Sequence, residues 1–111
     1  MLIKPAKEVK FVEQNLEDDF VSLPEKHPIK KGIQRAIENL KENAFRGNKI
    51  EKRLILLEYI KKYNIDNLWW YPLPDGWRLV YSIATNESEI LAVIMEYFDH
   101  KNYAKRFNYK T

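Results

Sequence analysis

The stretch LPDGWRLVYSI, residues 73–83, decides the fold because it joins a tight turn to an alternating strand. Pro74–Gly76 predicts the turn, since proline presets one turn dihedral and glycine tolerates a positive φ. Trp77–Ala84 then alternates, with Tyr81 on one face of the predicted sheet and Arg78 on the other. The stretch therefore predicts a β-hairpin whose second strand carries one arginine.

The next predicted strand is Ile90–Tyr97, which is apolar on both faces, as is typical of a central strand covered from both sides. It leads into the polar cluster DHKNY, residues 99–103. Antiparallel pairing of the two strands brings Arg78 near this cluster. Arginine, histidine, lysine and tyrosine together can bind a phosphodiester and transfer protons around it. We therefore expect Arg78 and His100 on one concave side of the sheet, within reach of the same phosphate.

The N-terminal part predicts a strand followed by two helices. Val9–Val12 alternates as a strand does, and Asn15 stands three residues before Asp18 like a helix cap, ahead of apolar residues at helical spacing. The second helix begins near Pro28, which suits a first helical turn. Its predicted apolar face consists of Ile29, Ile33, Ala36, Ile37, Leu40 and Ala44, and its polar face of Lys30, Lys31, Gln34, Arg35, Glu38 and Lys41.

The segment between this helix and the hairpin is ambiguous. Glu51–Tyr63 fits a helix or a buried strand, and we predict a helix. Asn67–Leu73 predicts a strand in which the adjacent Trp69 and Trp70 point to opposite faces. One tryptophan is then expected in the core, and the other either stacks on a nucleobase or is buried under the preceding segment. Altogether the sequence predicts a single α+β domain over residues 1–111.

Composition narrows the possible functions. At 111 residues, with 45% hydrophobic and 14% aromatic residues, the chain can fold around one modest core. Its apolar runs are too short to span a membrane, and residues 1–10 lack the apolar core of a signal peptide. The absence of cysteine and the presence of only two histidines argue against a metal site, and we expect no cofactor. The lack of cysteine also favours a cytoplasmic location.

Charge is distributed unevenly along the chain, whose net charge is +3. Residues 11–25 hold five acids and no base, whereas residues 41–62 hold seven bases against three acids. A basic middle and C-terminal segment predict an anion-binding face, with a solvated lysine-rich surface as the alternative. The candidate contacts to RNA phosphates are Lys49, Lys52, Arg53 and Lys101.

The order of these elements, with two motifs in it, resembles the RelE/ParE toxin superfamily, the toxic halves of type II toxin–antitoxin modules. GWRLVY, residues 76–81, is similar to the family's strand in which an arginine precedes an apolar–apolar–tyrosine run. HKNY, residues 100–103, is similar to the family's His-Arg-Lys-x-x-Tyr ending, shortened here. Together with EYFDHKNYAKRF, residues 96–107, these motifs look most like an archaeal branch of RelE-like proteins.

The resemblance implies a helical hairpin packed on a mostly antiparallel four-stranded sheet, and ribosome-dependent cleavage of messenger RNA without a metal. Arg78 would then bind the phosphate, His100 would transfer a proton, and Tyr103 would stack on a base or relay a proton. The implied partners are messenger RNA, the ribosome and a small antitoxin. The cationic segment Lys101–Lys110 favours an antitoxin that is acidic and partly disordered.

Two other functions stay open at this point. ParE relatives share the fold and inhibit DNA gyrase without cleaving RNA, and a degenerate toxin would survive as a binding module. Each candidate residue also has a purely structural alternative. These are a salt bridge for Arg78, a surface position beside Asp99 for His100, and core packing for Tyr103.

Overall fold

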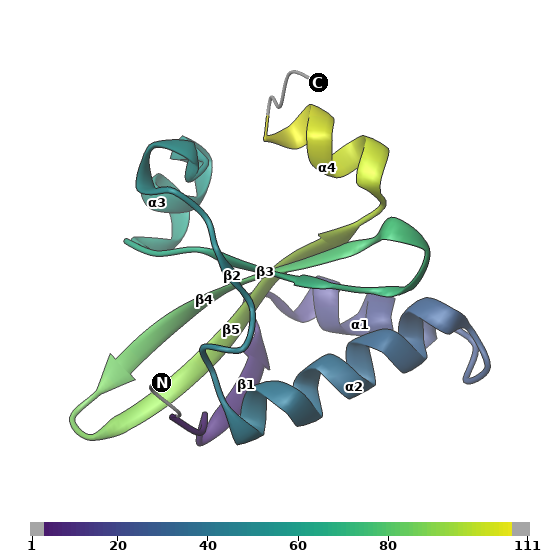
Figure 1. Cartoon of the computed structure of the whole chain (residues 1–111), viewed down its shortest axis with the longest axis horizontal. Coiled ribbons are helices and arrows are strands. Elements are labelled where there is room, and N and C mark those ends of the chain that lie inside the picture. The colour runs from purple at the N-terminus through teal and green to yellow at the C-terminus, as the bar shows by residue number, and fades with distance from the viewer. Residues whose placement is uncertain (1–3, 108–111) are drawn as a thin grey trace.

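The computed structural model describes residues 4–107, which form an α+β fold around one five-stranded mixed sheet (Figure 1). The strand order is β1-β5-β4-β3-β2, in which β1 runs parallel to β5 and the other neighbours are antiparallel. The strands are β1 (Glu8–Phe11), β2 (Asn48–Lys49), β3 (Trp69–Pro72), β4 (Arg78–Asn86) and β5 (Glu89–Phe98). The helices are α1 (Gln14–Ser22), α2 (Pro28–Glu42), α3 (Leu57–Tyr63) and α4 (His100–Arg106), with 3-10 turns η1 (Lys52–Leu54) and η2 (Pro74–Gly76).

The predicted meander of three strands is confirmed by the pairing of β3 with β4 and of β4 with β5. In the turn η2, Asp75 and Gly76 have φ angles of 58° and 79°. Gly76 thus adopts a positive φ in the turn that the sequence predicts, a conformation that glycine tolerates because it has no Cβ. The sheet has five strands where the sequence predicts four. The extra strand is β2, whose two residues extend the sheet beyond β3.

A bulge in β5 determines which of its side chains share a face. Val80 lies opposite Glu96, but the next residue, Tyr81, lies opposite Ile94, so Met95 has no opposite residue in β4. An extra residue of this kind turns the following side chains to the other face and bends the strand. The bulge therefore keeps both Met95 and Glu96 on the same side of the sheet, beside α3.

The two faces of the sheet carry different helices. Residues directly opposite each other on paired strands point to the same face. Arg78 lies opposite Phe98 and therefore shares its face, which α3 and α4 cover and which we call the α4 face. Tyr81 points to the other face, which α1 and α2 cover (Figure 1). We call it the hairpin face, after the helical hairpin that α1 and α2 form.

The larger core lies on the hairpin face, where the apolar stripe of α2 packs as predicted. Its buried residues include Ile29, Ile33, Ala36 and Leu40 from α2, Leu79, Tyr81 and Ile83 from β4, and Ala92 and Ile94 from β5. The Tyr81 hydroxyl donates to the carbonyl of Ala44 at 2.8 Å and accepts from the amide of Gly47 at 3.0 Å. Burial raises the pKa of Tyr81 to about 12, so the phenol stays neutral and joins the end of α2 to the sheet.

The prediction that Lys30 lies on the polar face of α2 is wrong. Its side chain is buried, and its ammonium donates to the carbonyls of Val21 and Leu23 at 2.9 and 3.0 Å and to Glu25 at 2.8 Å. The carbonyls at the end of α1 have no partner within the helix, and a cation there also interacts favourably with the helix dipole. Lys30 therefore joins α1 to α2.

Replacing Lys30 with methionine is expected to lower the free energy of unfolding by about 1.5–3 kcal/mol, the scale of hydrogen bonds to a charged group. The thioether keeps most of the apolar stem but leaves the carbonyls of Val21 and Leu23 without this donor. Urea unfolding measures the loss. The matched control is Lys31→Met on the exposed side of the same helix, for which a change within about 0.5 kcal/mol is expected. Equal effects of the two substitutions would show that the buried ammonium is not important.

The second core lies on the α4 face and differs from expectation in two places. Glu51–Tyr63 is not one helix, because η1 and α3 are separated by the extended residues Ile55 and Leu56, of which Ile55 is buried. The cluster DHKNY is the beginning of α4, where the Asp99 carboxylate caps the helix by accepting from the amide of Asn102 at 2.8 Å. α3 and α4 thus cover the part of the sheet from which Arg78 projects.

Candidate functional site

The guanidinium of Arg78 lies between two aromatic rings on the α4 face. Its Cζ is 3.9 Å from the ring centroid of Trp70 in β3 and 4.5 Å from that of Tyr103 in α4. Tyr103 in turn stacks on Phe107, with ring centroids 4.7 Å apart and planes inclined at 27°. The stack of Trp70, Arg78, Tyr103 and Phe107 joins β3, β4 and the C-terminal helical segment, and we call it the arginine stack.

The arginine stack leaves the N–H edge of Arg78 available. Within residues 4–107 this side chain forms no hydrogen bond and no ion pair. The salt bridge that was the structural alternative for Arg78 is therefore not found among these residues. Both rings lie against the guanidinium, whose five donors lie in its plane. The side chain is partly exposed. A flat, fixed and permanently charged fork of this kind suits bidentate binding of a phosphate.

Tyr103 is completely buried, with 0% of its surface exposed. Its ring contacts Phe98 edge-on at 5.7 Å, stacks on Phe107, and faces Arg78. With α4 docked in this way, the ring is not available to stack on a nucleobase. The geometry instead supports a role in which Tyr103 holds the guanidinium of Arg78 in place.

His100 is exposed at the first residue of α4. It lies beside the turn that precedes β4, because a Cβ built on Gly76 would be 3.6 Å from the Cβ of His100. His100 and Arg78 therefore border the same end of β4. Among the described residues the side chain of His100 has no hydrogen-bond partner, and the carboxylate of the neighbouring Asp99 caps the helix. Whether both side chains reach one phosphate stays a prediction.

The two adjacent tryptophans point to opposite faces, as predicted. Trp69 lies on the hairpin face, with its ring centroid 5.4 Å from Phe45 and 6.3 Å from Tyr81. Trp70 lies on the α4 face, where it packs on the second core and supports Arg78. Stacking on a nucleobase and burial under the preceding segment were both open for one of the two tryptophans, and Trp70 packs on the same core as Leu54 and Tyr63 of that segment while also contacting Arg78.

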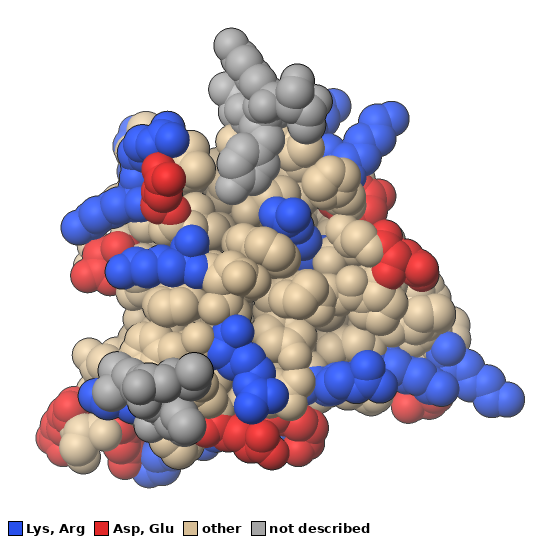
Figure 2. All heavy atoms as spheres, in the orientation of Figure 1, with Lys and Arg blue, Asp and Glu red and all other residues tan. Residues whose placement is uncertain are grey.

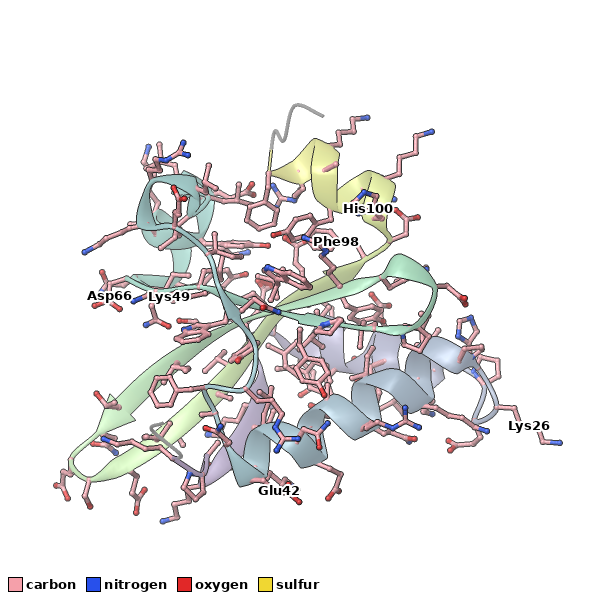
Figure 3. The ribbon with its side chains drawn as sticks, in the orientation of Figure 1. Lys26, Glu42, Lys49, Asp66, Phe98 and His100 are labelled. Carbon is pink, nitrogen blue, oxygen red and sulfur yellow. The ribbon has the colours of Figure 1, made fainter. Side chains whose placement is uncertain are left out.

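The candidate RNA-binding cations lie on both flanks of the arginine stack. Lys49 in β2 and Lys52 in η1 are exposed, and so is Lys101 on α4. Arg53 is exposed too but pairs with Glu51 at 2.8 Å. Figure 2 shows basic side chains over the segment of η1 and α3 and again over α4. In Figure 3, Lys49 in the edge strand β2 lies apart from His100 at the start of α4, which follows β5.

Beyond these residues, the basic segment predicted to run to Lys110 is described only as far as Phe107, so Lys110 lies outside the described residues.

Arg106, which the sequence did not single out, joins α4 to β5 and α3. Its Nη2 donates to Glu96 in β5 at 2.9 Å, and its Nη1 donates to Glu58 in α3. Tyr59 of α3 also donates to Glu96. The hydrogen bond from Arg106 lowers the pKa of Glu58, and burial followed by the bond to Glu96 raises the pKa of Tyr59. We call Glu58, Tyr59, Glu96 and Arg106 the α4 latch.

A signal for α4 was present in the sequence. Asp99 is a favoured N-cap residue, and Tyr103, Arg106 and Phe107 follow at spacings of three and four that place them on one side of a helix. The position of Trp70 against Arg78 had no comparable signal, because it depends on the register between β3 and β4.

Among residues 4–107, no three histidine, aspartate or glutamate side chains gather as the ligands of a metal ion would. No helix in that range combines the length and the apolarity needed to cross a bilayer.

Comparison of the chain with protein families, with curated proteins and with solved structures finds no match. The arginine stack, with His100 beside it and exposed cations around it, is the feature of the described residues that suits an anionic ligand.

Proposed function

We propose that this protein is a RelE-like toxin, an endoribonuclease that cleaves messenger RNA on the ribosome and is silenced by an antitoxin. The observation that carries the proposal is the guanidinium of Arg78, which contacts two aromatic rings while its donors have no acceptor among residues 4–107. Such a group is fixed before the substrate arrives, and preorganised charge of this kind is among the largest contributions to catalysis. The motifs around Arg78 and His100 that resemble the RelE family support the same reaction.

In the proposed reaction a ribose 2′-hydroxyl attacks the adjacent phosphorus. The bond from phosphorus to the 5′-oxygen breaks, which leaves a 2′,3′-cyclic phosphate and a new 5′-hydroxyl. Arg78 donates to the non-bridging oxygens, where negative charge grows in the transition state. His100 accepts the proton of the attacking hydroxyl or donates one to the leaving oxygen, a task that imidazole can perform near neutral pH. Tyr103 keeps Arg78 in position and does not contact the RNA.

The charges around the arginine stack suit the proposed partners. The exposed cations Lys49, Lys52 and Lys101 would contact phosphates of the messenger RNA on either side of the cleaved bond. Arg53 contributes less in this proposal, because Glu51 already neutralises it. An acidic antitoxin segment would compete for the same cations, which explains how a protein partner would silence the site.

The proposal is tested by incubating the purified protein with ribosomes programmed with a defined message and mapping the new 5′ ends. We expect cleavage that yields 5′-hydroxyl ends and that continues when a chelator removes transition metals but leaves the Mg²⁺ that ribosomes require. In cells, induction should arrest growth together with loss of message. Arrest with intact RNA and blocked DNA supercoiling would overturn the proposal in favour of gyrase inhibition. An intact message in every assay would leave only a binding role.

A further inference from the structure

The arginine stack depends on an element that is unstable by itself. α4 has seven residues, and isolated helices of this length do not persist in water. It nevertheless supplies Tyr103, one of the two rings that hold Arg78. The other ring, Trp70, comes from a paired strand of the sheet and is fixed by its register with Val80. Whatever holds α4 against the sheet therefore decides whether Arg78 is held on one side or on both.

Within residues 4–107, the α4 latch is a polar contact that fixes this helix from its far end. Arg106 and Tyr103 are three residues apart, so they lie on the same side of α4. The guanidinium of Arg106 binds Glu96 of β5 and Glu58 of α3, and it also lies 5.6 Å from the ring centroid of Tyr59. One side chain thus joins α4 to two other elements. Its side chain is 31% exposed, so solvent screens the contact to Glu96 only in part.

We propose that Arg106 is a positioning residue for Arg78, because by binding Glu58 and Glu96 it keeps Tyr103 stacked on the guanidinium that binds phosphate. The inference rests on the proposed function for its effect on RNA, but its structural part concerns Arg78 alone. Loss of the latch loosens α4, removes one ring from the guanidinium of Arg78 and leaves the side chain free to rotate. The charge on Arg78 is unchanged, so what is lost is the fixed orientation of its donors.

The structural part is tested with the ¹⁵N–¹H signal of Arg78 Nε, which is assigned by its disappearance in Arg78→Lys. Two flanking rings displace this signal from the position of a solvated arginine. In Arg106→Met we expect it to move toward that position, and in Arg106→Lys to move only part of the way. Lys105→Met removes the same charge from an exposed position of α4 and should leave the signal in place. An unchanged signal in folded Arg106→Met would overturn the inference.

Ile33→Val is the control for a general loss of stability, because it weakens the core on the hairpin face without touching α4. This variant should leave the Arg78 signal unchanged. If Arg106→Met does not fold, Glu58→Gln provides the same test, since Glu58 is 60% exposed and its replacement leaves the core intact. A displaced signal in Glu58→Gln supports the latch, and an unchanged signal contradicts it.

The functional part is tested with a short fluorescently labelled single-stranded RNA. The affinity of Arg106→Met is expected to be about tenfold lower than that of Lys105→Met, which is the scale of coupling between residues in one network. Equal affinities with a displaced Arg78 signal would overturn the functional step. If the wild-type protein neither binds nor cleaves RNA, the proposed function fails, while the Arg78 signal still decides whether Arg106 positions Arg78.

Discussion

Replacing Arg78 with alanine is expected to lower the rate of messenger RNA cleavage by about 10²–10³, the usual cost of removing one donor that stabilises transition-state charge. The guanidinium is held between Trp70 and Tyr103 with its N–H edge open, so its removal takes away charge that the fold has already oriented. The rate is measured under single-turnover conditions on ribosome-bound message. The protein should remain folded, because loss of the two ring contacts costs about 0.5–2 kcal/mol.

Two further variants separate orientation from charge at Arg78. Arg78→Lys keeps the charge but cannot donate to two oxygens in one plane, so it should restore only part of the rate. Arg35→Ala removes an exposed arginine from α2 on the hairpin side and serves as the matched control, with an expected rate close to that of the wild type. Full activity of Arg78→Ala, or an equal loss in Arg35→Ala, would rule out the proposed role of Arg78.

The central part of the fold could be predicted because its signals are local. The turn PDG, the alternation after it and the apolar run of the last strand are each contained in a short stretch, and together they predict how β3, β4 and β5 pair. The apolar stripe of α2 is equally local, since it repeats at helical spacing along one helix. The sequence therefore placed Arg78 on the correct face and near the end of β5.

The remaining features depend on contacts between distant residues. From the sequence Lys30 is expected to be a solvated lysine on the polar face of α2. In the structure the end of α1 packs against it, and its ammonium donates to two carbonyls there. In the same way the sequence alone suggests that Tyr103 stacks on a base, whereas in the structure α4 packs on the sheet and buries it. Arg106 gains its role only because Glu58 and Glu96 come together from two other elements. Residue types therefore indicated the chemistry that we propose for the site, but not which residues would contact RNA and which would support others.

Replacing His100 with alanine is expected to lower the cleavage rate by about 10²–10⁴, the usual contribution of a group that transfers a proton. The side chain of His100 has no hydrogen-bond partner among the described residues and is exposed, so the free energy of unfolding should change by no more than about 0.5 kcal/mol. A large loss of rate in a protein of unchanged stability would assign His100 to the reaction and not to the fold. Unchanged activity would contradict that assignment.

The pH dependence of the rate gives a second and independent test of His100. A group that transfers a proton in the reaction makes the rate depend on pH, so the wild-type rate should change with pH. This dependence should be absent from His100→Ala and present in Asn102→Ala, the matched control in the same exposed turn of α4. Arg78→Lys keeps the positive charge, so it should lower the rate at every pH and keep the shape of the profile. If His100→Ala is slow but retains the wild-type profile, another group transfers the proton, and His100 contributes only to substrate binding at the start of α4.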